Sequence, residues 1–284
     1  MFKIISLPRD LLAIAVATVL ISVTLIQSFN AYAIPFSNLK ASTASSSTTF
    51  PQSNSVLASL GERWWNFAFS LDTTRVINPF TDTTGASCGI GLQPNNLLFL
   101  FGTAGEITTS GGTGGHTGDV RTCYTPIPRG TSILFPVLNT ECSVAEGNGF
   151  TEQDLRNACT TITNHAFISS LTAIVDGKQL LSSNGQIQQS HAVTAPGGFQ
   201  LTIVPNNPFG VTKVITDPNL PARPFHQPIT TLSVADGFWV LLSNLQPGPH
   251  TIKFGGVYDF NQPQNPPDLG FVFRTEVTYN LSVQ

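Results

Sequence analysis

Charged side chains are scarce in this sequence. Only 10% of its 284 residues are Asp, Glu, Lys or Arg, and the net charge is -3. No basic run is present that could neutralise a row of phosphates, so nucleic acid is not expected as a partner. The 24 glycines and 20 prolines interrupt long helices and favour short strands joined by turns, which argues against an all-α bundle. The 41% of hydrophobic residues are enough for a sizeable core.

The common catalytic and metal-binding motifs are also missing. There is no Gly-x-Ser-x-Gly sequence, so a Ser-His-Asp hydrolase is not expected. No CxxC occurs, and no two of the five histidines are two or four residues apart, which argues against a local metal site. The glycine-rich residues 102–119 lack the Lys-Ser/Thr ending of a phosphate-binding loop, and they are predicted to form a surface loop.

The N-terminus carries the pattern of an export signal. Lys3 and Arg9 precede the apolar run 11–26, and the small residues Ala31 and Ala33 follow it at cleavage-site spacing. We predict a signal peptide over residues 1–33, with an uncleaved membrane anchor as the alternative and the only expected contact with a membrane. Residues 34–54 are rich in Ser and Thr and are predicted to be a flexible tether. The protein is therefore expected to be secreted or extracellular and associated with the cell surface.

An even number of cysteines follows the export signal. In an oxidising compartment four cysteines favour two disulfides, for which three connectivities exist. Sequential pairing is favoured because each bridge then closes a local, loop-rich excursion. The four residues are Cys88, Cys123, Cys142 and Cys159.

Two segments have the pattern of helices. Residues 55–71 place apolar side chains at spacings of three and four, namely Leu57, Leu60, Trp64 and Phe67. The second helix is predicted from Thr151 to Phe167, because Thr-Glu-Gln-Asp at its start approximates a capping box.

Most of the remaining chain is predicted to form strands. The apolar runs 97–101 and 133–138 are typical of strands buried on both faces, and residues 277–283 alternate between apolar and polar. Residues 237–243 and 249–254 flank a Gln-Pro-Gly turn and predict a hairpin, and residues 175–178 predict a second tight turn. We expect one mainly all-β domain over residues 55–284, a jelly-roll-like β-sandwich decorated with two helices.

Candidate site residues are acidic or aromatic side chains that stand beside apolar runs. Glu141 and Asp82 are candidates for catalysis, because paired carboxylates perform the acid-base chemistry of glycoside hydrolysis. The candidates for ligand binding are Trp64, Trp65, Asp236 and Trp239. For each of these the alternative is a structural role in a core, a cap or a turn. No metal-binding set is expected. Calcium is the one cofactor left open, through the loop aspartates Asp82, Asp217, Asp259 and Asp268.

Short motifs follow one another in a definite order along the exported part. They are Trp64 and Trp65, Asn78 and Pro79, residues 82–85, Cys88, Arg121 and Cys123, Pro128 and Gly130, Phe135, Pro136 and Asn139, residues 175–177, residues 236–238, and Gly248 and His250. This order resembles that of a group of exported prokaryotic proteins of unassigned function. The resemblance implies a single exported domain and carries no activity.

Three functions are compatible with these features. The first is a secreted or surface-tethered protein that binds a glycan or another cell-envelope ligand, as aromatic content, low charge and a tether allow. The second is a secreted carbohydrate-active enzyme that uses paired carboxylates. The third is a structural envelope component, which would have no ligand cleft.

Overall fold

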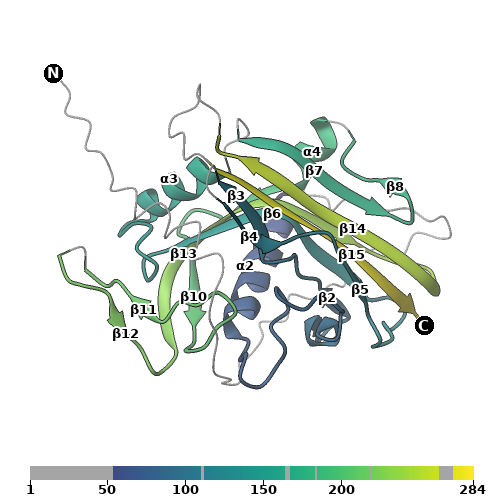
Figure 1. Ribbon diagram of the computed structural model, residues 1–284, viewed down its shortest axis with the longest axis horizontal. Coiled ribbons are helices and arrows are strands. Elements are labelled where there is room, and N and C mark those ends of the chain that lie inside the picture. Colours follow the sequence, from purple (N-terminus) through teal and green to yellow (C-terminus); the bar gives the residue numbers. More distant parts are fainter. Residues whose placement is uncertain (1–53, 110–111, 164–166, 183, 218, 262–270) are drawn as a thin grey trace.

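A computed structural model of the chain describes residues 54–109, 112–163, 167–182, 184–217, 219–261 and 271–284 (Figure 1). The expected signal peptide, and all of the expected tether except Asn54, lie outside these residues. In the described part, two large sheets of mostly antiparallel strands form a β-sandwich, and helices lie against it. The mainly β fold predicted from the sequence is confirmed.

The central sheet is built around two long antiparallel strands, β6 (Ser132–Ser143) and β13 (Ile229–Leu242). The strands beside this pair are shorter: β1 (Leu92–Gln93), β2 (Leu97–Phe99), β9 (His191–Val193) and β10 (Phe199–Ile203). Both faces of the central sheet are covered, and ten consecutive residues at the end of β13 are buried. This explains why these strands are continuous apolar runs in the sequence.

The outer sheet is centred on β14 (Gly248–Asp259) and β15 (Phe271–Val283). The other members are β3 (Gly105–Thr109), β4 (Gly112–His116), β5 (Asp119–Thr122), β7 (Ile168–Val175) and β8 (Lys178–Gln179). The C-terminal alternation is confirmed: Val277, Tyr279, Leu281 and Val283 are buried, whereas the residues between them are more exposed. The tight turn at residues 175–178 is confirmed as the connection between β7 and β8.

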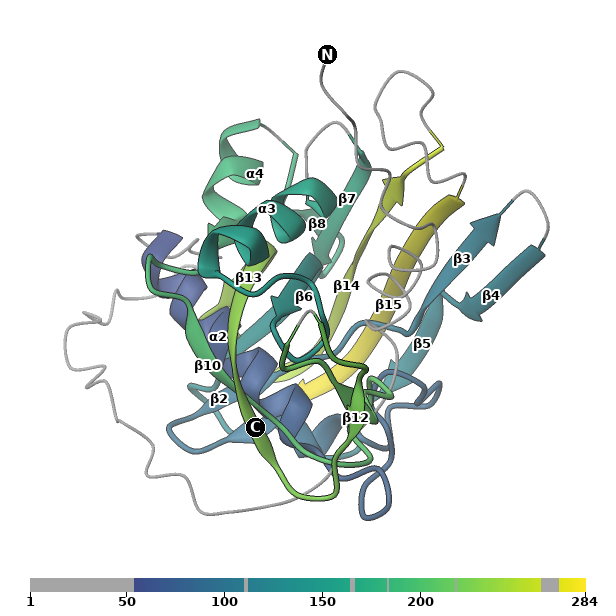
Figure 2. The same ribbon diagram turned by 90° about the vertical axis from the view of Figure 1, so that its left-hand side faces the viewer.

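Two hydrophobic cores lie on opposite faces of the central sheet. The core between the sheets contains Phe135 and Phe238 from the central sheet and Phe254 from the outer one. On the other face, helix α2 (Asn54–Ser70) places Leu57, Leu60 and Trp64 against the sheet, as the helical spacing predicted. Figure 2 shows α2 beside β10 and β13, on the side away from β14 and β15. The layers are therefore outer sheet, central sheet and α2.

Smaller elements complete the fold. Helix α3 (Glu152–Ile162) begins at Thr151 with the predicted capping box, formed with Asp154, and ends five residues before the predicted Phe167. A third helix, α4 (Asn184–Ser190), was not predicted, since its sequence is polar and has no apolar stripe. The remaining elements are a short 3-10 helix (Cys88–Gly91) and the strand pair β11 (Lys213–Val214) and β12 (Arg223–Pro224).

The four cysteines form two disulfides in the sequential pairing favoured by the sequence. Cys88 is bonded to Cys123, and Cys142 is bonded to Cys159. The second bridge ties α3 to β6, and both of its cysteines are fully buried. Disulfides of this kind are typical of chains that fold in an oxidising compartment.

Two predictions of strand arrangement are wrong. Residues 237–243 and 249–254 do not form a hairpin, because β13 and β14 belong to different sheets. Apolar side chains of both strands, such as Leu242 and Ile252, are buried in the core between the two sheets. The sequence pattern of two strands that pack face to face is the same as that of two strands paired edge to edge. The glycine-rich residues 102–119 are not simply a loop. They include β3, β4 and the first residue of β5, and the pairing of β3 with β15 and with β4 outweighs the low strand propensity of the glycines.

Candidate functional site

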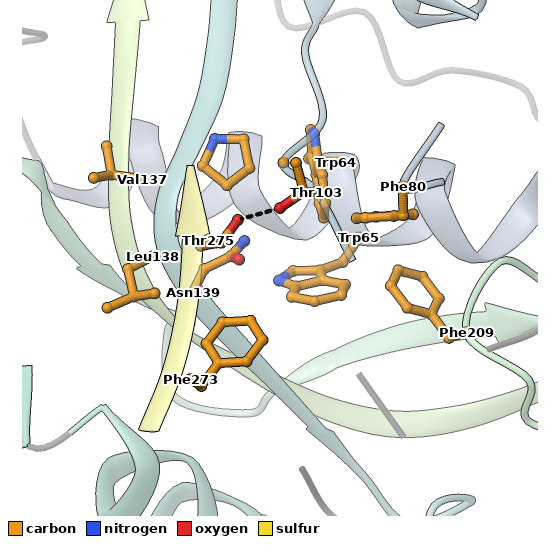
Figure 3. Close-up of a pocket in the computed structure, with 12 residues that line it drawn as sticks. Trp64, Trp65, Phe80, Thr103, Val137, Leu138, Asn139, Phe209, Phe273 and Thr275 are labelled. Atoms are coloured by element: carbon orange, nitrogen blue, oxygen red, sulfur yellow. Dashed lines mark hydrogen bonds between the residues drawn. The ribbon is translucent and has the colours of Figure 1, made fainter. Parts of the chain in front are cut away.

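A small cavity lies where α2, β6 and β15 meet (Figure 3). Its volume is about 40 Å³, which is enough for about three water molecules. No acidic or basic side chain is among the residues that line it. These are Trp64, Trp65, Phe80, Gly102, Thr103, Pro136, Val137, Leu138, Asn139, Phe209, Phe273 and Thr275.

The cavity lies beside a part of β6 that is paired with a strand on one side only. β2 is paired with β6 only as far as Leu134, after which the chain leaves towards β3 and, in the described part of the structure, no strand takes its place. Pro136, which has no N–H to offer a neighbour, stands on this open edge. The register with β13 also shifts between Pro136 and Leu138, so that a β-bulge at Val137 redirects the side chains that follow it.

Aromatic rings form one wall of the cavity. Trp64 and Trp65 meet edge to face, with ring centroids 5.0 Å apart. Phe209 lies 5.6 Å from Trp65 and 4.8 Å from Phe80, again between ring centroids. Trp239 packs behind this wall, 5.5 Å from Trp64, and does not line the cavity. Such aromatic contacts stabilise the wall.

The two adjacent indole N–H groups have different surroundings. Trp64 Nε1 donates to the carbonyl oxygen of Leu100 at 2.9 Å. Trp65 is 3% exposed, yet its Nε1 has no acceptor among the residues that the structure describes, and neither has the buried Nδ2 of Asn139. Figure 3 shows the nitrogen edge of Trp65 turned towards the amide of Asn139. Buried donors are normally satisfied, so two unsatisfied donors at one cavity indicate a site for an acceptor.

Only part of the predicted ligand-binding set comes together. Trp64 and Trp65 line the cavity, whereas Asp236 lies elsewhere, where its Oδ1 is 2.7 Å from His191 Nε2. Burial and the nearby Asp236 carboxylate raise the pKa of the Tyr258 phenol, which stays protonated at neutral pH.

The structure pairs Glu141 with Glu146 and not with Asp82. Glu141 accepts a hydrogen bond from Ser233 Oγ, and Ser143 Oγ donates to Glu146 at 2.7 Å. Burial raises the pKa of both carboxyl groups, and the neighbouring Glu146 raises that of Glu141 further. The two groups are hydrogen-bonded to each other, so they share a proton.

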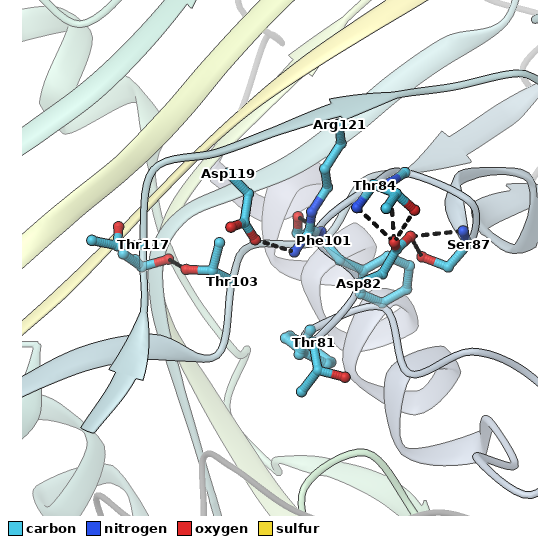
Figure 4. Close-up of polar contacts among 12 residues, drawn as sticks. Thr81, Asp82, Thr84, Ser87, Phe101, Thr103, Thr117, Asp119 and Arg121 are labelled. Carbon is cyan, nitrogen blue, oxygen red and sulfur yellow. Dashed lines mark hydrogen bonds and ion pairs between the residues drawn. The ribbon is translucent and has the colours of Figure 1, made fainter.

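Asp82 organises its own loop beside a buried arginine (Figure 4). Burial disfavours its charge, but hydrogen bonds from Ser87 and Thr84 outweigh this and hold the pKa of Asp82 far below its usual range. Nearby, the fully buried Arg121 donates to the carbonyl oxygen of Phe101 at 3.2 Å and lies 3.4 Å from Asp119. These contacts fix the chain that leads into the cavity wall.

The loop aspartates do not converge in the described part of the chain. Asp217 and Asp259 accept hydrogen bonds from Asn219 and Asn261 in separate turns, and Asp268 lies outside the described residues. Among the residues described, no group of three or more His, Cys, Asp or Glu side chains is placed to hold a metal ion. The helices described there include none that is both long and apolar enough to cross a membrane.

Several residues of the cavity escaped sequence reasoning. Phe80, Thr103, Phe209 and the β15 residues Phe273 and Thr275 come from four separate places in the chain, and no local pattern connects these places. The one sequence signal of an open edge was the proline at position 136 within the strand pattern, and Asn139 lies further along the same strand. Comparison with known proteins gives no further guidance, since no family model, curated protein or solved structure matches the chain.

Proposed function

We propose that this chain is a secreted or cell-surface-associated β-sandwich protein that binds a glycan of the cell envelope at the cavity between α2, β6 and β15. The observation that carries the proposal is the unpartnered Trp65 Nε1 at an aromatic, uncharged cavity. Binding sites for small molecules combine apolar walls with a few polar groups that fix orientation. Sugars offer this combination, because their C–H faces pack on aromatic rings while their oxygens accept hydrogen bonds. The two disulfides support export to an oxidising environment.

A glycan array tests this proposal. The full chain, produced with export to an oxidising compartment, is expected to bind a subset of envelope glycans, and Trp65→Phe is expected to weaken that binding. Tyr124→Phe is the control, since Tyr124 is 79% exposed and is not among the residues that line the cavity. Silence on every glycan, or equal binding by Trp65→Phe, contradicts the proposal. Silence instead favours a structural envelope component.

One observation favours a second candidate, a carbohydrate-active enzyme. The buried Glu141 lies beside the partly buried Glu146, and Ser143 and Ser233 are hydrogen-bonded to this pair of carboxyl groups. A carboxyl group whose pKa is raised by burial can act as a general acid. Product analysis of each glycan that binds tests this candidate. Turnover that Glu141→Gln abolishes supports it, and turnover that survives the substitution excludes Glu141 as the acid.

A further inference from the structure

Resting on the proposed glycan binding, we propose that the cavity takes the acetamido group of an N-acetylated sugar. The side chain that identifies this group is Trp65, whose indole N–H donates to the acetamido carbonyl oxygen. Asn139 supplies a second donor from the open edge of β6. The sugar ring itself stays outside the cavity.

The size of the cavity favours a substituent over a ring. A volume of about 40 Å³ holds about three water molecules, which equals the three heavy atoms of an acetyl group. A sugar ring with its hydroxyl groups has more than ten heavy atoms and does not fit. The part of the ligand that enters is therefore a short side group.

The lining sets the chemistry of that group. No charged side chain lines the cavity, so a carboxylate, phosphate or ammonium group would enter without a counter-charge, at a high desolvation cost. Trp65, Phe80 and Phe209 offer aromatic surface suited to a methyl group. The group is therefore neutral and partly apolar.

The unpartnered donors require an acceptor. Trp65 Nε1 and Asn139 Nδ2 are both buried and have no partner among the described residues, whereas Trp64 Nε1 in the same wall is satisfied by Leu100. A hydroxymethyl or hydroxyl group supplies an oxygen but no methyl, and a methyl group supplies no acceptor. An acetamido group supplies a carbonyl oxygen and a methyl together, which matches both features of the cavity.

The test compares two sugars that differ in this group. Chitotetraose and cellotetraose share a β-1,4-linked backbone, and the former carries acetamido groups where the latter has hydroxyls. Calorimetric titration of the full chain is expected to give at least about 10-fold tighter binding of chitotetraose. In Trp65→Phe, which lacks only the N–H donor and part of the ring, the ratio of the two affinities is expected to fall about 10-fold, because the buried carbonyl then loses its partner.

The other possible results separate a failure of the acetamido assignment from a failure of glycan binding. Equal affinity for the two sugars overturns the acetamido assignment and leaves glycan binding in place, whereas binding of neither sugar and of no array glycan overturns both. A ratio that is unchanged in Trp65→Phe shows that the cavity holds water only and overturns the inference. An acetyl-lysine peptide that binds as tightly as chitotetraose overturns the choice of a sugar. If Trp65→Phe does not fold, Asn139→Leu removes the second donor at similar volume and is expected to lower the same ratio.

Discussion

The buried carboxyl pair of Glu141 and Glu146 is expected to make the protein less stable as pH rises. Burial raises the pKa of both groups above the usual value of 4.5, so the folded pair keeps a proton that the unfolded chain has already released. The stability contributed by this proton is fully present below about pH 4.5 and is lost as pH rises through the folded pKa. The perturbation that isolates this effect is Glu141→Gln, because an amide has the same size, does not titrate and still donates a hydrogen bond to Glu146.

The expected change in the free energy of unfolding follows from the one extra proton that the folded pair binds. A difference of one bound proton between the folded and unfolded states changes the free energy of unfolding by about 1.4 kcal/mol per pH unit. The wild-type protein is therefore expected to lose about 1.4 kcal/mol of stability per pH unit above about pH 4.5, for as long as the folded pair keeps its proton. Glu141→Gln lacks this loss, so its stability relative to the wild type is expected to rise with pH by up to about 1.4 kcal/mol per pH unit, and to differ least from the wild type near pH 4.5.

Urea unfolding at a series of pH values, followed by tryptophan fluorescence, measures this slope. Glu276→Gln is the matched control, since it makes the same chemical change at a half-exposed carboxylate that is paired with Lys253. The control is expected to keep the wild-type dependence on pH. If the slope of Glu141→Gln equals that of the wild type, or if the variant is less stable at every pH, the two carboxyl groups do not share a proton and the reasoning is refuted.

Three further predictions concern stability. Trp64→Phe leaves the buried carbonyl oxygen of Leu100 without its donor and is expected to lower the free energy of unfolding by about 1 to 3 kcal/mol in urea denaturation, so an unchanged midpoint contradicts the hydrogen bond. Thr151→Ala removes the capping box of α3 and is expected to cost about 1 kcal/mol by the same assay, whereas a cost near zero means that α3 needs no cap. Replacing both Cys142 and Cys159 by alanine opens a loop of 17 residues and is expected to lower the free energy of unfolding by about 3 kcal/mol in thermal unfolding. Full alkylation of the unreduced wild-type protein by a thiol reagent would contradict both disulfides.

Local patterns predicted much of the fold. The spacing of Leu57, Leu60 and Trp64 located α2, and the alternation over residues 277–283 located the inner face of β15. These signals work because helix and strand periodicities depend only on neighbours in the sequence. The sandwich followed from many short strands with frequent turns.

Arrangements between distant segments were beyond such patterns. The turn near Pro247 has the residues of a hairpin, yet it passes from one sheet to the other, and Leu242 and Ile252 are both buried in the core between the sheets. The partner of Glu141 was missed for a related reason. Glu146 is five residues away in a turn after β6, and only the folded turn brings its carboxyl group back to the strand.

The candidate site was predicted in part. Trp64 and Trp65 were singled out as aromatic residues near polar ones, and they line the cavity. The feature that makes the cavity a candidate site is a missing acceptor at Trp65 Nε1, and a missing contact is visible only when the surrounding side chains are in place. Asp236 was singled out by the same reasoning, but it lies beside His191 and away from the cavity wall.

The most direct test of ligand binding at the cavity is a ¹H–¹⁵N spectrum of the indole N–H groups during titration with an envelope glycan that the array identifies. The chain has three tryptophans, so three indole resonances are expected, and Trp65→Phe assigns one of them. We predict that the Trp65 resonance shifts most as the glycan is added, because its N–H gains an acceptor. A glycan that binds while the Trp65 resonance stays in place would contradict the account.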